Sequence, residues 1–257
     1  MARYCLLLLA CLPASAQEDN TRQLWNQEFL KKRPAGTGTG RAPQVKYKPT
    51  GVSGETGSGT PGAGAGTMLG ITLWRVRPPK PSDPDGTRLL VLGEPGGPTS
   101  EETQERVEAG MPLRKGDRIR IAVEIPLTGY LYVIEREHYD NDSWGDPTLI
   151  YPNKLTRAAV LCFLVSPDPI ADLRSGGSML RLDTARFADW QKRWAVKTER
   201  YELEGGTGKA WTARENQAGA NRAVQLTQDD PVPQTLYRVA AKPGSPILLE
   251  VPLTLKQ

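Results

Sequence analysis

The chain has 257 residues and carries 33 basic and 29 acidic side chains, but the basic excess is unevenly distributed. From Met68 onward there are 25 side chains of each sign, because Arg3 and the stretch 17–67 hold the whole surplus. Binding to nucleic acid requires a basic face that neutralises phosphates, so no nucleic-acid partner is expected. The single histidine, His138, likewise leaves too few ligands for a zinc centre.

Residues 1–16 have the pattern of an export signal. Arg3 precedes an apolar run from Tyr4 to Pro13, and Ala14-Ser15-Ala16 is followed by a polar stretch. This pattern predicts cleavage after Ala16 and a protein exported to the periplasm or the extracellular space. An alternative takes residues 8–11 as a lipobox, which would anchor the chain to a membrane through Cys11. No later segment has the roughly 18 to 20 apolar residues of a membrane-spanning helix, so no transmembrane span is expected.

Residues 17–67 are expected to form a flexible leader. Within 20–33, Leu24, Trp25, Phe29 and Leu30 recur at helical spacing, which predicts a short amphipathic helix that docks on a partner. A disordered N-terminus is favoured over this docking helix, because an isolated helix of this length is marginal in water. From residue 34 to residue 67, ten of 34 residues are glycine, which predicts a linker that cannot offset its ordering entropy.

From Met68 to the end, residues 68–257, the dominant hydrophobic period is two. The run "RIRIAVEIP" places Ile119, Ile121, Val123 and Ile125 on one face, and "GYLYVIERE" and "PILLEVPLTL" alternate in the same way. Further strands are expected at Gly70–Val76, Arg88–Leu92, Thr148–Tyr151, Val160–Val165 and Thr235–Ala241. One-sided strands joined by turns predict a mainly β fold, an antiparallel β-sandwich or an open barrel.

One region, residues 168–222, departs from this period and is expected to be a helical insertion within the same domain. Asp183 is a good N-cap, and Phe187, Trp190 and Trp194 follow at the spacing of a helix that packs on a sheet. The aromatic side chains are therefore interpreted as packing anchors. A second helix is expected near residues 212–220. Cys162, inside "AVLCFLV", is expected to be a buried hydrophobic residue without redox chemistry.

The segment "GDRIRIAVEIPLTGYLYVIERE" is followed by a short polar turn and by "LIYPN". This arrangement resembles the core of a bacterial exported family catalogued as a domain of unknown function, in which a GYLYV-type strand precedes an acidic turn and a strand ending in LFPN. Some chains of that family also carry caspase-like peptidase or kinase domains. The match covers Leu113–Asn153 and extends loosely to the C-terminal strand. It implies a β-sandwich-like accessory module with no assigned chemistry.

The turn "DNDSWGD" in this segment holds several residues of types that favour tight turns, which is sufficient to explain them. An irregular oxygen-ligand site formed by Asp140, Asp142 and Asp146 is the alternative, although the spacing fails as an EF-hand. Glu135 and Glu137 are expected on a solvated strand face rather than as an acid–base pair. Farther along, "GGTGKAW" lacks two residues of a phosphate-binding loop and is expected to be a turn.

These patterns together predict a non-catalytic module that works through protein contacts in the bacterial cell envelope and needs no cofactor. The expected contact residues are Trp25 and Phe29 in the leader and Tyr139, Trp144 and Tyr151 around the acidic turn. A glycan-binding module that uses exposed aromatic side chains is the alternative, and an uncharacterised hydrolase is the third hypothesis.

Overall fold

The computed structural model describes residues 29–35, 45–52, 66–84, 87–91, 100–114, 117–137, 143–150, 160–171, 173, 180–210, 227–228, 230–253 and 255–256. Within these ranges, no helix has both the length and the apolar character needed to cross a membrane.

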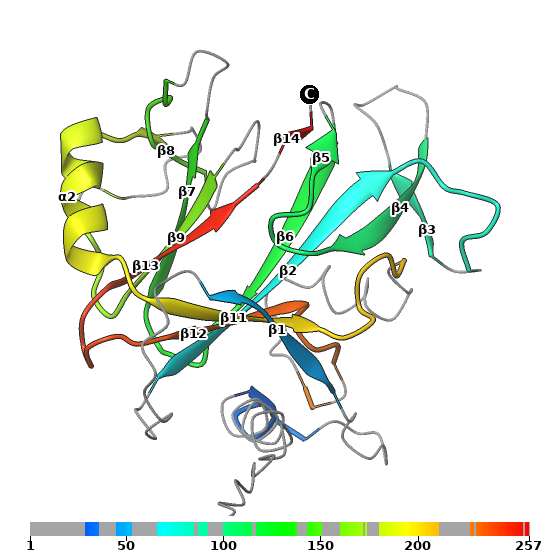
Figure 1. Ribbon diagram of the computed structural model, residues 1–257, viewed down its shortest axis with the longest axis horizontal. Coiled ribbons are helices and arrows are strands. Elements are labelled where there is room, and N and C mark those ends of the chain that lie inside the picture. Colours follow the sequence, from blue (N-terminus) through cyan, green and yellow to red (C-terminus); the bar gives the residue numbers. More distant parts are fainter. Residues whose placement is uncertain are drawn as a thin grey trace, which may run out of the picture.

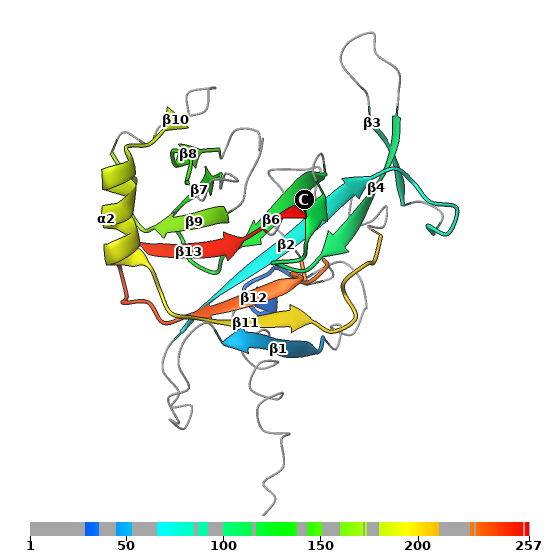
Figure 2. The same ribbon diagram turned by 45° about the horizontal axis from the view of Figure 1, so that its top comes forward.

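The described strands form two main antiparallel sheets (Figure 1, Figure 2). The larger, seven-stranded sheet contains β1 (Tyr47–Val52), β2 (Thr67–Arg77), β3 (Arg88–Val91), β4 (Ser100–Val107), β6 (Arg118–Glu124), β11 (Thr198–Leu203) and β12 (Thr235–Val239). The five-stranded sheet has the order β10 (Leu180–Arg181), β8 (Thr148–Leu149), β7 (Tyr130–Arg136), β9 (Val160–Ser166) and β13 (Ile247–Pro252). β5 (Leu113–Arg114) and β14 (Leu255–Lys256) form a small parallel pair, and α2 (Thr184–Trp194) is the α-helix. The prediction of a mainly β, sandwich-like fold with a small helical insertion is confirmed, because the two main sheets do not close into a barrel.

The larger sheet divides at β2. β6 pairs with β2 over residues 70–76, whereas β12 pairs with residues 67–71 and β4 with residues 73–77. Because β6 occupies one edge of β2, β12 and β4 share the other edge and the sheet branches there. The turn 204–208 reaches β4 from the β11 side, where Gly208 N–H donates to the Arg106 carbonyl at 2.9 Å. The phosphate-loop-like sequence is therefore a turn, as predicted.

The fold has four layers, which are α2, the five-stranded sheet, the seven-stranded sheet and the N-terminal residues 29–30. Three hydrophobic clusters fill the spaces between them. Leu69, Ile71 and Leu73 of β2 meet Phe163 of β9 in the core between the sheets. On the outer face of the five-stranded sheet, Leu164 and its neighbours pack against α2. On the outer face of the seven-stranded sheet, Met68 and its neighbours pack against residues 29–30. In Figure 1, α2 lies at the left beside the five-stranded sheet, and the N-terminal turn lies below β1 and β11.

Helix α2 begins where the sequence predicts. The Asp183 side chain accepts a hydrogen bond from the Arg186 N–H at 2.7 Å, which caps the first turn. Phe187 and Trp190 are buried against the five-stranded sheet, so these two aromatic side chains are packing anchors. Cys162 lies in the same cluster, and burial raises the pKa of its thiol to about 12, as expected of an unreactive core cysteine.

The prediction of a flexible leader is wrong for two segments. Phe29 and Leu30 are 2% and 6% exposed and belong to a core cluster with Met68 and Leu236. Tyr47–Val52 is β1, which pairs antiparallel with β11 at the edge of the larger sheet. This short strand is stabilised by its partner rather than by its own alternation, so the glycine-rich sequence around it concealed it. Residues 29–30 and Tyr47–Val52 are therefore parts of the folded structure.

The predicted insertion 168–222 is likewise only partly an insertion. It contains α2, but it also contains β11, which lies between β1 and β12 in the larger sheet. The second helix expected near residues 212–220 lies outside the described residues.

Candidate functional site

Trp144 is the predicted contact residue that the structure places on the surface. It lies between β7 and β8, and its side chain is 47% exposed. The neighbouring Gly145 N–H donates to the Glu137 carbonyl at 2.9 Å, which returns the chain toward the end of β7. Trp144 is thus displayed at the β7–β8 end of the five-stranded sheet.

Arg136, the last residue of β7, stacks its guanidinium on the Trp144 ring. The Arg136 guanidinium carbon lies 5.0 Å from the centroid of the Trp144 ring and 5.7 Å from that of the Phe187 ring. Phe187 is 1% exposed, so the cation is held between a buried ring on α2 and an exposed ring on the turn. The exposed aromatic is therefore restrained in orientation before it contacts anything outside the chain.

The start of α2 holds the same turn in place. The Thr184 hydroxyl donates to Asp146 Oδ1 at 3.3 Å, and the Leu182 N–H donates to the Pro147 carbonyl at 2.8 Å. Asp146 and Pro147 are therefore held against the segment that leads into α2. One carboxylate oxygen of Asp146, Oδ1, accepts the hydrogen bond from Thr184.

Of the other predicted contact residues, Phe29 is the one that the structure describes. Trp25, His138, Tyr139, Asp140, Asp142 and Tyr151 lie outside the described residues. Phe29 is buried in the core cluster with Met68 and Leu236, so the prediction that it contacts a partner from an exposed helix is wrong. In the described part of the chain, no three His, Cys, Asp or Glu side chains gather in a group that would hold a metal ion.

Glu135 corrects a further expectation. Its neighbour Glu137 is half-buried, but Glu135 is only 5% exposed, so these strand positions are not a solvated face. The reason is that β7 is a central strand between β8 and β9, with one face toward the core and the other toward α2. The alternating sequence pattern does not show whether β7 is a central strand or an edge strand.

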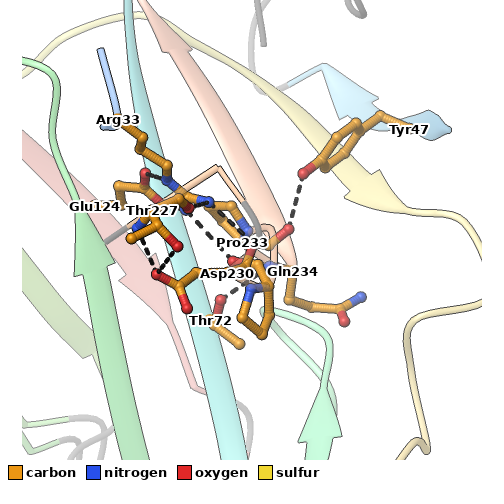
Figure 3. A network of polar contacts seen from close by, with 9 residues as sticks. Arg33, Tyr47, Thr72, Glu124, Thr227, Asp230, Pro233 and Gln234 are labelled. Carbon is orange, nitrogen blue, oxygen red and sulfur yellow. Dashed lines mark hydrogen bonds and ion pairs between the residues drawn. The ribbon is translucent and has the colours of Figure 1, made fainter. Parts of the chain in front are cut away.

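Arg33 forms a second polar centre, which sequence patterns did not indicate (Figure 3). Its side chain is 4% exposed, and it makes a bidentate pair with Glu124 of β6, Nε to Oε1 at 2.7 Å and Nη2 to Oε2 at 2.5 Å. Burial raises the pKa of Glu124, and the hydrogen bonds from Arg33 oppose that rise. Glu124 lies 91 positions from Arg33 in sequence, which is why no local signal revealed the pair.

A set of carbonyl oxygens completes the environment of Arg33. Nη1 donates to the carbonyls of Asp230 at 3.1 Å and Thr227 at 3.4 Å, and Nη2 donates to that of Pro231 at 3.4 Å. The Asp230 carboxylate accepts from the Thr227 N–H at 2.5 Å, which holds the turn that presents these oxygens. One carboxylate and three carbonyls thus match the planar fan of guanidinium donors.

A shallow depression of about 430 Å³ lies where β2 and β4 approach the turn after β11, and its lining includes Arg77, Asp83 and Glu105. Arg77 donates to both Asp83 oxygens at 2.8 and 2.7 Å and also bonds to Glu105. The hydrogen bonds from Arg77 hold the pKa of Asp83 well below its usual range. An acid catalyst would need the opposite shift, so this network is suited to holding β2 and β4 rather than to proton transfer.

Comparison of the chain with protein-family models, with curated proteins and with solved structures finds no match in any of the three.

Proposed function

We propose that this chain is an exported, non-catalytic β-sandwich module that contacts another protein of the cell envelope through Trp144. The observation that carries the proposal is the exposed Trp144 ring held on Arg136 and, through it, on Phe187. Tryptophan and arginine dominate the residues that contribute most to protein interfaces. A restrained side chain also loses less conformational entropy on binding than a free one.

The surroundings of Trp144 favour a protein partner. Leu180, which is 36% exposed, lies on β10, the strand that pairs with β8 at this edge of the five-stranded sheet. Trp144 and Leu180 thus add two large exposed apolar side chains to this part of the five-stranded sheet. Aromatic side chains are enriched in protein interfaces.

The test compares two variants with equally exposed aromatic side chains. Trp144→Ala removes the proposed contact, and Tyr130→Ala removes a side chain that is 48% exposed at the opposite end of β7. In the native host, crosslinking of the tagged chain should give a defined protein adduct that is reduced about 30-fold or more by Trp144→Ala, because such hot spots contribute about 2 kcal/mol or more. Tyr130→Ala should leave the adduct unchanged.

Two results would reject this function. An adduct that survives Trp144→Ala places the contact elsewhere on the molecule. Alternatively, calorimetry could detect binding of soluble cell-wall glycan fragments that Trp144→Ala abolishes, without any Trp144-dependent protein adduct. That outcome would make the chain a glycan-binding module, in which the same ring stacks on a sugar.

A further inference from the structure

The Arg33 environment has the construction of a peptide-binding site that is occupied by the chain's own N-terminal segment. We define the receptor as Glu124 together with the carbonyls of Thr227, Asp230 and Pro231, and the guest as residues 29–33. The guest enters from far away in sequence, since its Arg33 contacts lie 91 to 198 positions further along the chain. Figure 3 shows Arg33 directed into this receptor, with Glu124 beside it.

The guest is bound by an apolar part as well as a charged part. Phe29 and Leu30 are buried in a cluster with Met68, Tyr201 and Leu236, side chains of β2, β11 and β12. The Arg33 N–H donates to the Phe29 carbonyl at 3.0 Å, and this turn presents the two apolar side chains and the guanidinium together. By contrast, the intervening Lys31 is exposed. The receptor is thus suited to two adjacent apolar residues followed, after two positions, by arginine.

The edge strand β1 is likewise held by residues that are distant in sequence. Among the described strands its partner is β11, and Tyr47 donates its hydroxyl hydrogen to the Pro233 carbonyl at 2.9 Å, next to the receptor. In sequence, residues 36–44 precede β1 and residues 53–65 follow it, and these stretches contain three and five glycines. The 13 residues of the second stretch reach at most roughly 45 Å when extended.

We propose that the receptor also takes residues 29–33 of a second copy of this chain, so that two molecules exchange their segments 29–52. Every contact of the guest would be made identically in the closed monomer and in the exchanged dimer, because both consist of the same residues. The balance then depends on the effective concentration set by the connection 53–65 against the protein concentration. Exchange of an identical element is a low-cost route to a dimer for this reason.

A pair of charge reversals tests the exchange. In Arg33→Glu alone the guest places a carboxylate against Glu124, and in Glu124→Arg alone two guanidiniums oppose each other, so neither variant closes well on itself. In a mixed dimer, Arg33 of one copy meets Glu124 of the other, and the two reversed residues also meet. The two full-length variants are mixed, incubated at a temperature below melting, and examined by native mass spectrometry.

The expected result is a 1:1 heterodimer that exceeds by at least tenfold the homodimer of either variant alone. The matched control is Lys31→Glu, which makes the same charge change at an exposed position and should form no heterodimer preference. The double variant Arg33→Glu with Glu124→Arg in one chain should melt above both single variants but below the wild type. The reversed pair attracts, whereas the new carboxylate at position 33 faces the carbonyls of Thr227, Asp230 and Pro231. Absence of the heterodimer when the double variant melts above both single variants would overturn the proposal.

A second measurement decides the matter if the single variants do not fold. Wild-type chain labelled with heavy isotopes is mixed with unlabelled chain at high protein concentration and incubated in the same way. Dimers of intermediate mass are expected after incubation. Phe29→Ala weakens the guest equally in the monomer and the dimer, so it should make these dimers form faster without changing their fraction at equilibrium. Persistence of monomers alone at all concentrations rejects the exchange.

Discussion

At the scale of single residues, the buried Glu202 is the ionisable group with the clearest consequence for stability. It is 3% exposed on β11, and its carboxylate accepts a hydrogen bond from the Thr235 hydroxyl at 2.7 Å. Burial raises its pKa to about 7 from the usual 4.5, although the Thr235 hydrogen bond and Arg200 oppose the shift and Glu108 adds to it. The folded protein therefore holds a proton that the unfolded chain releases.

The raised pKa of Glu202 makes the stability of the protein depend on pH. Between pH 4.5 and pH 7 the unfolded chain ionises Glu202 while the folded protein does not, so stability should fall across this window and then level off. Glu202→Gln keeps the acceptor for Thr235 and removes the ionisation. The variant should match the wild type near pH 4.5 and exceed it at pH 8, by on the order of 3 kcal/mol.

Denaturant unfolding of both proteins at several pH values measures the difference. Glu204→Gln, the same substitution at an exposed neighbour, is the control and should show no such gain. An equal separation between Glu202→Gln and the wild type at pH 4.5 and pH 8 would mean that the carboxyl does not titrate in this window.

At the scale of elements, the start of β7 depends on a close approach between two backbones. A β-carbon on Gly129 would lie 2.5 Å from the Ser166 carbonyl oxygen, in the residue that pairs with Tyr130. Because a carbonyl in a paired strand cannot move aside cheaply, Gly129→Ala should destabilise the fold by about 1–3 kcal/mol. Thermal or denaturant melting measures this, and Thr128→Ala, at an exposed position, should stay within about 0.5 kcal/mol of wild type. Equal stability of the two variants would show that β7 and β9 can separate here.

The sequence predicts strands well where one face is apolar and fails where pairing supplies the stability. β6, β7 and β13 alternate clearly, β9 is a continuous apolar run, and all four were expected, as was α2 with its Asp183 cap. β4, with the sequence SEETQERV, has almost no apolar pattern, because its buried side chains include Thr103, Gln104 and Arg106. Its place between β2 and β3 comes from the sheet, which local patterns do not describe.

The candidate sites divide in the same way. An exposed tryptophan in a polar turn is visible in the sequence, so Trp144 was expected as a contact residue. Its support by Arg136 and Phe187 joins β7 to a helix about 50 positions away, and the Arg33–Glu124 pair joins residues 91 positions apart. Contacts of this kind depend on the tertiary arrangement and leave no periodic signal.

At the scale of the whole molecule, the N-terminal segment is an outer layer of the sandwich. Residues 29–33 pack on the face of the seven-stranded sheet opposite to the one that packs against the five-stranded sheet, and β1 extends the sheet at its edge beside β11. The same face receives residues 230–234, whose carbonyls accept from Arg33 and Tyr47. Two distant parts of the chain thus complete one surface, and the segment is bound by contacts rather than by its connection to β2.

A cut between β1 and β2 tests whether contacts alone hold the N-terminal segment on the sheet. Glu55 is the one glutamate between β1 and β2 in sequence, so a glutamyl endopeptidase should cut there in a glycine-rich stretch. The N-terminal fragment should stay bound after the cut, because Phe29, Leu30, Arg33 and β1 keep their contacts. Under native conditions the two fragments should elute together in size-exclusion chromatography, and they should separate in denaturant.

The matched variant is Phe29→Ala, which removes a buried aromatic side chain of the segment and should cost about 3–5 kcal/mol of its binding. After the same cut, this variant should release the fragment under native conditions, because no covalent connection remains to hold it. In the uncut chain the loss should be smaller, since the connection keeps the segment near its receptor at high effective concentration. Release of the wild-type fragment at once would mean that the segment is a tethered leader after all, held near the sheet by residues 53–65 alone.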